Sequence, residues 1–289
     1  MFQRFSKSIL FAPLFSLLLG GVFVVSCGDD DNEEKVQDSS SNQNADNGSS
    51  DNGNGGGFVF DGKDKEYTVN GVSFKMIAVK GGTFQMGSND GYDNEKPVHQ
   101  VTLTKGYYIG ETEVTQELWC AVMGSNPSNF TGNMMRPVEK VSWNDCQCFI
   151  SKLNELTGEA FCLPTEAQWE YAARGGNKSK GYIFSGSNNF ENVAWCNESY
   201  TGSSHPVKTK APNELGIYDM SGNVSEWCSD WYNSYSSSVQ TDPAGPSTGY
   251  VHVCRGGDWI NGAHYCCVAS RLCYSSSDLY NFLGMRLAL

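Results

Sequence analysis

Hydrophobic and polar positions divide the chain into three stretches. Residues 9–25 form an apolar run that contains Pro13, and residues 28–57 are rich in Asp, Asn, Ser and Gly. From about residue 66 onward, short aromatic and β-branched runs alternate with Gly, Asn and Ser. This pattern suits an N-terminal signal, then a flexible tether, then a folded domain.

Two segments of the third stretch carry the apolar spacing of a helix. They cover residues 145–156 and 165–174, and the second has Pro164 before it and Thr165 as a possible N-cap. The remaining short runs and turn residues are typical of strands joined by irregular loops. The pattern predicts one loop-rich α+β domain over residues 66–289, long enough to bury a core.

The N-terminal stretch has the form of a lipoprotein signal. Arg4 and Lys7 precede the apolar run, and residues 24–27 (Val-Val-Ser-Cys) have the form of a lipobox. We expect residues 1–26 to be a signal peptide, Cys27 to carry lipid, and residues 27–65 to be the tether. A transmembrane helix is the alternative, which Pro13 and the small residue before Cys27 disfavour.

Residues 28–34 add an expectation about location. Their sequence, Gly-Asp-Asp-Asp-Asn-Glu-Glu, resembles the acidic tag by which some Gram-negative lineages move lipoproteins to the outer surface. The start of a solvated linker would have a similar composition. We expect an outer membrane lipoprotein exposed at the cell surface.

Net charge limits the classes of binding partner, and cysteine content bears on disulfide bonds and zinc binding. The net charge of -12 disfavours nucleic acid, because phosphate binding needs a basic surface. Membrane contact is expected through the lipid anchor only. Ten of the 11 cysteines remain after Cys27, and outside the cytoplasm some of them can pair. The sequence leaves both disulfides and free core thiols open, and the Cys146 and Cys148 spacing is too tight for zinc.

An ordered series of motifs runs through the domain. It includes Gly-Gly-Thr-Phe-Gln-Met-Gly-Ser at 81–88, Leu-Pro-Thr-Glu-Ala-Gln-Trp-Glu at 163–170, Gly-Asn-Val-Ser-Glu-Trp at 222–227 and Arg-Gly-Gly-Asp-Trp at 255–259. The series resembles the formylglycine-generating enzyme, or sulfatase-modifying factor, family. This resemblance implies an irregular, loop-rich α+β structure, the formylglycine-generating-enzyme type of C-type lectin fold.

The same resemblance bears on catalysis. Members of the family use two cysteines, six and eleven positions after the Arg of Arg-Gly-Gly, to bind Cu(I), and soft thiolates suit that ion. Counted from Arg255, the first position holds Asn261 and the second holds Cys266. An amide is no substitute for a thiolate, so we expect neither copper nor the family's oxidase activity.

Calcium is the metal that the resemblance favours. Asn192 and Val193 resemble one calcium-binding segment of the family, and Asn223, Val224 and Glu226 resemble another. Carboxylate, amide and backbone carbonyl oxygens are the ligands of a hard cation. The alternative for Glu226 is a structural hydrogen bond to the backbone of its loop.

Composition singles out the C-terminal tail. Residues 260–282 contain no Lys, Glu, Gln, Met or Trp, although these types supply 54 of the 289 residues. A codon ending in C or T cannot encode any of the five. This composition resembles variable proteins of diversity-generating retroelements, in which Asn codons are randomised at their adenines. Many of these variable proteins are surface lipoproteins with the formylglycine-generating-enzyme type of lectin fold, and their variable segment lies at the C-terminus of that fold.

We therefore interpret residues 258–282 as a candidate variable ligand-binding segment. It mixes rigid aromatic and small polar side chains, as antibody loops do, and would bind a protein or glycan. The expected contacts are Asp258, Ile260, Asn261, His264, Tyr274, Asp278, Tyr280 and Phe282.

The alternatives are a divergent oxidase that uses Cys266, an iron oxygenase and an accessory structural lipoprotein. The chain's four histidines form no close motif of two histidines and a carboxylate, which disfavours iron.

Overall fold

The computed structural model describes residues 60–199 and 202–289. These residues belong to one compact unit. Packing begins before the expected boundary at residue 66, because the ring of Phe60 lies 5.3 Å from that of Tyr108 and the Tyr108 hydroxyl donates to Asp61 at 2.6 Å. The predicted signal peptide, Cys27 and residues 28–59 lie outside the described residues.

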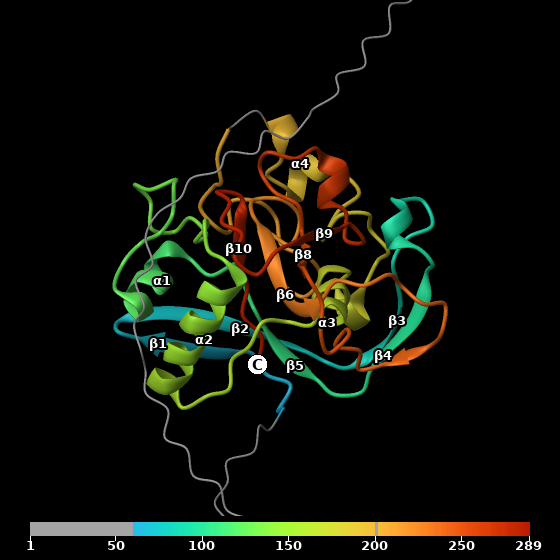
Figure 1. The fold of residues 1–289 in the computed structure, drawn as a ribbon, viewed down its shortest axis with the longest axis horizontal. Coiled ribbons are helices and arrows are strands. Elements are labelled where there is room, and N and C mark those ends of the chain that lie inside the picture. Colours follow the sequence, from blue (N-terminus) through green and yellow to red (C-terminus); the bar gives the residue numbers. More distant parts are fainter. Residues whose placement is uncertain (1–59, 200–201) are drawn as a thin grey trace, which may run out of the picture. The chain divides into compact units, whose positions relative to one another are not determined.

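Three small sheets form the framework (Figure 1). The first has the order β1 (Lys65–Val69), β2 (Val72–Val79), β5 (Tyr107–Gly110), and all its pairs are antiparallel. The second has the order β3 (Gly82–Met86), β4 (His99–Leu103), β7 (Gln240–Thr241). The third has the order β10 (Leu283–Met285), β6 (Ser225–Trp231), β8 (His252–Arg255), β9 (Arg271–Tyr274).

The helices are short. The α-helices are α1 (Gln116–Met123), α2 (Trp143–Thr157), α3 (Glu166–Ala173) and α4 (Phe190–Val193). Single 3-10 turns are η1 (Asp93–Glu95), η2 (Gly176–Lys178), η3 (Asn197–Ser199) and η4 (Ala263–Cys266). Both predicted helices are present as α2 and α3, so the predicted mixture of helix and sheet is confirmed. α1 was not predicted, although it lies between an N-cap at Thr115 and Gly124 in the left-handed conformation.

Two apolar cores lie on either side of β6. Successive side chains of a strand point to opposite faces, and Trp227 belongs to one core while Cys228 belongs to the other. The first core joins α1 and α2, where Trp119 stacks on Phe149 with ring centroids 4.8 Å apart. The second core contains Trp169 of α3. The third sheet is therefore held from both faces, and its loops start from a fixed base.

The tail loops lie at one end of the domain. In Figure 1 they are red and lie at the top, next to α4, away from β1 and β2.

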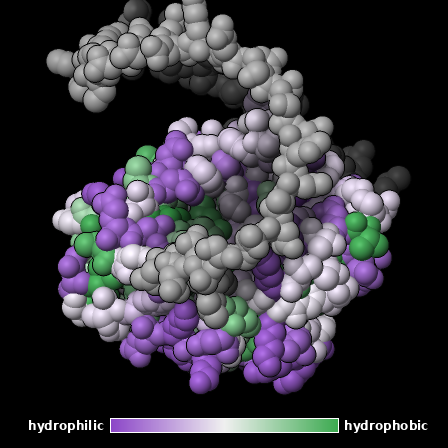
Figure 2. Space-filling model, turned by 90° about the horizontal axis from the view of Figure 1, so that it is seen from below, coloured by the Kyte–Doolittle hydropathy of each residue, from purple (hydrophilic) through white to green (hydrophobic). Residues whose placement is uncertain are grey.

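Figure 2 views the molecule from below and shows a mainly hydrophilic face with small, separated hydrophobic patches. Within the described ranges, no helix is both long and apolar enough to cross a membrane.

Candidate functional site

The tail leaves the third sheet through a turn that requires glycine. Gly256 and Gly257 follow β8 with φ of 95° and 66°, a conformation that glycine adopts without steric cost. A Cβ atom on Gly257 would lie 2.6 Å from the carbonyl oxygen of Tyr265. The turn therefore brings the start of residues 258–282 against the η4 segment.

Asp258 organises the first loop of the tail from inside. Its carboxylate accepts hydrogen bonds from the backbone N–H groups of Ile260 and Asn261 at 3.1 and 3.0 Å and from the Ser225 hydroxyl at 2.9 Å. The Asn261 amide donates to both carboxylate oxygens, at 3.0 and 2.9 Å. Asp258 is fully buried, so the expectation that it contacts a ligand directly is wrong for this conformation. It supports its neighbours instead.

Apolar side chains of the tail reach the surface beside this loop. Ile260 is 47% exposed, Leu279 is 50% exposed and Tyr280 is 40% exposed. The Trp259 indole N–H donates to the Asn281 carbonyl at 3.1 Å, which joins the beginning of the segment to its end. The structure thus gathers the two ends of the predicted segment at one place.

Aromatic stacking fixes the second half of the segment. The Tyr280 and Phe282 rings are stacked with centroids 4.9 Å apart, and Tyr274 lies 5.3 and 5.9 Å from them. Asp278 closes the preceding turn by accepting a hydrogen bond from the Ser275 N–H at 3.0 Å. Tyr274, Asp278 and Phe282 are half-buried, so their main contribution is to hold the exposed residues.

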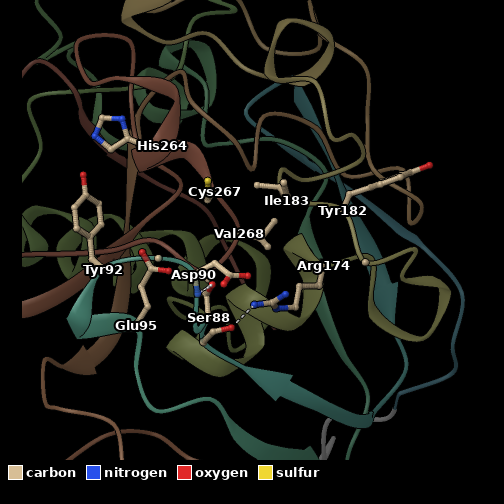
Figure 3. Close-up of a pocket in the computed structure, with 14 residues that line it drawn as sticks. Ser88, Asp90, Tyr92, Glu95, Arg174, Tyr182, Ile183, His264, Cys267 and Val268 are labelled. Atoms are coloured by element: carbon tan, nitrogen blue, oxygen red, sulfur yellow. Dashed lines mark hydrogen bonds between the residues drawn. The ribbon is translucent and has the colours of Figure 1, made fainter.

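His264 lies at a different place, on the wall of a cavity of about 650 Å³ (Figure 3). Residues that precede the predicted tail segment supply one side of this cavity, and residues of the segment supply the other. The lining residues are Gly87, Ser88, Asp90, Gly91, Tyr92, Glu95, Arg174, Gly181, Tyr182, Ile183, His264, Cys267, Val268 and Ala269.

The cavity is electrostatically mixed. Glu95 is only 2% exposed, and burial raises the pKa of its carboxyl group. Arg174 donates to the Gly87 carbonyl at 2.8 Å and pairs with Glu170, so its charge is already partly used. Burial raises the pKa of the Cys267 thiol to about 11, which leaves it protonated and weakly nucleophilic at neutral pH.

Aromatic rings form one edge of the cavity. Tyr92 stacks on Tyr265 with centroids 5.5 Å apart and lies 5.8 Å from the His264 ring. Tyr92, Glu95 and Arg174 were not predicted as site residues from the sequence. These residues come from distant segments, and no local pattern indicates that they meet.

Buried ion pairs lie beneath the tail, at the ends of the strands β8 and β9 from which it extends. Arg255, at the end of β8, pairs with Glu170, and both side chains are fully buried. Burial alone would raise the pKa of Glu170, but the charges of Arg255 and Arg174 outweigh it and lower that pKa. Arg271, at the start of β9, donates to Glu166 at 2.5 and 2.8 Å. These pairs join the helix α3 to the strands that carry the tail.

The second predicted calcium segment is saturated by protein donors. Glu226 accepts hydrogen bonds from the Trp169 indole at 2.6 Å and from Arg286 at 2.7 to 3.1 Å. The Asn223 amide donates to Glu113 at 2.9 Å, and its oxygen accepts from the His205 N–H at 2.7 Å. This donor set does not suit a cation in the present conformation.

The first predicted calcium segment is engaged only in part by hydrogen bonds within the chain. The Asn192 carbonyl accepts from the Ala211 N–H at 3.0 Å, and Val193 is a buried part of α4. Within residues 60–199 and 202–289, no three His, Cys, Asp or Glu side chains are grouped to hold a metal. Calcium stays an expectation that rests on the family resemblance alone, and the hydrogen bonds of Glu226 to Trp169 and Arg286 oppose it.

The two positions of the copper pair are also engaged. The Asn261 amide is hydrogen-bonded to Asp258, as described above, and Cys266 is fully buried. A hydrogen bond to Cys196, together with burial, raises the pKa of Cys266 well above its usual range. Neither side chain is presented to the cavity as a metal ligand or nucleophile.

Comparison with known proteins identifies the family of this chain and proteins with a related sequence. Residues 65–289 match the family model of the sulfatase-modifying factor enzyme 1-like domain. The chaperone protein LppX of Paenibacillus barcinonensis is 35% identical over 243 residues, which cover 67% of this chain and 81% of that protein. The formylglycine-generating enzyme of Streptomyces coelicolor is 30% identical over 285 residues, which cover 74% and 88% of the two chains.

Among solved structures, Treponema denticola variable protein 1 is similar over nearly its whole length. The match has a TM-score of 0.73 and 37% identity, and it covers 78% of this chain and 98% of that one. The predicted fold class and the predicted similarity to variable proteins of this family are confirmed.

Proposed function

Since this chain belongs to the sulfatase-modifying factor enzyme 1-like family, we propose that it is a non-catalytic member whose tail, residues 258–282, binds a protein or glycan ligand. The proposal includes a lipid anchor at Cys27 and display at the cell surface. Similarity to variable protein 1 supports it, as does the lack of Lys, Glu, Gln, Met and Trp from residues 260–282.

The observation that carries the proposal is exposed apolar surface on a rigid base. Ile260, Leu279 and Tyr280 reach solvent, while Asp258 and the ring of Phe282 fix the loops beneath them. Rigid loops lose little conformational entropy on binding, and aromatic side chains supply contact area. This arrangement favours recognition of a ligand by the exposed side chains of Ile260, Leu279 and Tyr280.

The engaged copper positions support the non-catalytic part. A cuprous site needs two soft ligands, whereas Asn261 donates its amide protons to Asp258. Members that carry out the oxidation would present two thiols there. Catalysis by Cys266 alone would need exposure that its burial opposes.

A random-peptide phage library tests the proposal with a defined probe. Peptides selected on the purified full chain are titrated against a triple variant, Ile260→Ala, Leu279→Ala and Tyr280→Ala. We expect at least a tenfold weaker affinity. The matched control changes two other exposed apolar residues, Val239→Ala and Tyr250→Ala, and should bind as the unchanged chain does. Equal affinity for all three proteins would refute the proposal.

One comparison favours a second candidate function, that of an accessory lipoprotein. The 35% identity to the chaperone protein LppX makes such a role the alternative. An accessory lipoprotein would keep one fixed tail sequence and would slow the aggregation of an unfolded client protein. A diversified tail, and no effect on aggregation, would favour the ligand-binding proposal.

A further inference from the structure

Two buried cysteines meet behind the tail loop. Cys196 precedes η3, and Cys266 is the last residue of η4. Both are fully buried and belong to one small apolar cluster with Phe184 and Val193. The two thiol groups lie within hydrogen-bonding reach of each other.

Hydrogen bonds on the neighbouring residues hold these segments in register. The Asn197 N–H donates to the Asn261 carbonyl at 2.9 Å. The Ala263 N–H donates to the Glu198 carboxylate, also at 2.9 Å. The contact between the thiols is therefore part of a wider contact between two chain segments.

We propose that Cys196 and Cys266 form a disulfide bond that fastens the tail loop to the constant part of the domain. Disulfides persist in oxidising compartments outside the cytoplasm. The bond joins the segment that carries Ile260 and His264 to Cys196, which directly precedes η3 and lies outside the candidate variable segment. It forms whether or not the tail binds a ligand.

The reaction balances with a disulfide oxidant such as oxidised glutathione. Both thiols are fully buried once the domain has folded, so the exchange takes place while the chain folds and glutathione disulfide can still reach the Cys196 thiolate. That thiolate attacks one sulfur of glutathione disulfide and releases one glutathione thiolate. Cys266 then gives up its proton and attacks the Cys196 sulfur, which releases the second. The protein loses two electrons and two protons, and one glutathione disulfide becomes two glutathiones.

The neighbouring thiol Cys267 is a poorer partner. Its half-buried side chain lines the cavity and packs against the edge of the apolar cluster, whereas Cys266 is a fully buried member of that cluster together with Cys196. Burial raises the pKa of Cys267 to about 11, so little thiolate is present at neutral pH. The adjacent Cys267 therefore offers a matched control for Cys266.

The bond closes a long loop. It links residues about 70 positions apart in the sequence, and a cross-link of that length restricts the unfolded chain strongly. We expect the oxidised protein to unfold at a temperature roughly 5–10 °C above that of the reduced protein.

Thiol mapping of the full chain tests the bond. The reduced chain is unfolded and then refolded in oxidised glutathione, remaining thiols are alkylated, and a non-reduced digest is analysed by mass spectrometry with fragmentation. We expect a peptide that joins Cys196 to Cys266 in the unchanged chain and in Cys267→Ser. We expect it to be lost in Cys196→Ser and Cys266→Ser, together with the rise in the unfolding temperature.

Measurements on the unchanged chain decide the matter even if a buried serine variant fails to fold. Two free thiols at Cys196 and Cys266 after oxidation would overturn the proposal. A bridge from Cys196 to Cys267 would overturn it as well. So would an oxidised protein that carries the Cys196–Cys266 bridge yet unfolds at the temperature of the reduced one, since the bond would then not fasten the loop.

Discussion

Arg255 shows what a single residue contributes to the base of the tail. Its guanidinium pairs with Glu170 and donates to the Ser270 carbonyl, and it has no contact with solvent. A buried charge that loses its partner is strongly destabilising, because the desolvation cost remains while the attraction is gone.

The substitution Glu170→Gln tests this dependence. We expect it to lower the free energy of unfolding by about 3 kcal/mol or more in urea denaturation, since Arg255 and Arg174 both lose a charge partner. The control Asp93→Asn removes a fully exposed carboxylate and should leave the midpoint unchanged. A loss for Glu170→Gln as small as that of the control would show that the pair is not buried as described.

A second prediction at this scale concerns Asp230, a buried residue of β6. Burial, with the nearby Glu166 charge, raises the pKa of Asp230 to about 7 from the ordinary 3.8. Between these values the folded protein holds a proton that the unfolded chain has lost. Asp230 therefore contributes stability that is fully present below the unfolded pKa and is lost as pH rises through the folded pKa.

The variant Asp230→Asn cannot ionise. We subtract the free energy of unfolding of the unchanged chain from that of the variant. We expect this difference to increase by an amount on the order of 2 kcal/mol as pH rises from about 5 to about 8. Urea denaturation at both pH values measures this. A constant difference between the two proteins would mean that Asp230 does not titrate in this range.

At the scale of elements, the turn after β8 places the tail. Gly257→Ala would add both the cost of a positive φ and a Cβ contact of 2.6 Å with the Tyr265 carbonyl. Gly124→Ala is the matched control, because Gly124 has φ of 83° and nothing within 4 Å of its Cβ position.

We expect Gly257→Ala to cost roughly 1–2 kcal/mol more in unfolding free energy than Gly124→Ala, since only Gly257 has the backbone contact in addition to the dihedral strain. Peptides selected on the unchanged chain should bind Gly257→Ala more weakly and Gly124→Ala normally. Equal costs and equal binding would mean that the close turn does not position the tail.

The sequence predicts the elements whose signals are local. Thr165 caps α3 as expected, and Ser142 caps α2, which begins two residues before its predicted start. α1 is as long as α3 and was missed although Thr115 caps it, whereas Pro164 and Thr165 mark the start of α3 in the sequence. The ordered motifs and the family resemblance supplied the fold, which apolar spacing alone does not specify.

The candidate site was predictable only in part. The exposed tail residues Ile260 and Tyr280 follow from composition and position in the family motif. The burial of Asp258 and the meeting of Cys196 with Cys266 depend on contacts between distant segments. A sequence pattern indicates which residue types are present, but it does not indicate which side chains share one cavity.

At the scale of the whole molecule, the protein is a two-core scaffold with its exposed tail loops at one end. The calcium prediction belongs at this scale, because a cation bound at Glu226 would stabilise the entire domain. Since Arg286 and Trp169 already saturate Glu226, we expect millimolar calcium to leave the unfolding temperature within about 1 °C of its value in chelator. A clear rise specific for calcium over magnesium would establish a site that the present hydrogen bonds conceal.

The central claim is that the tail is a diversified binding surface on a constant base. Sequencing codons 255–289 of this locus in many cells of one population tests it most directly. We predict variation at codons of exposed residues such as Ile260, His264 and Tyr280, explained by changes at adenines of Asn-like template codons. The buried Asp258 and the turn residue Gly257 should stay fixed. A tail that is identical in every cell, or variation that strikes Gly257 and Asp258 as often as Ile260, would contradict the claim.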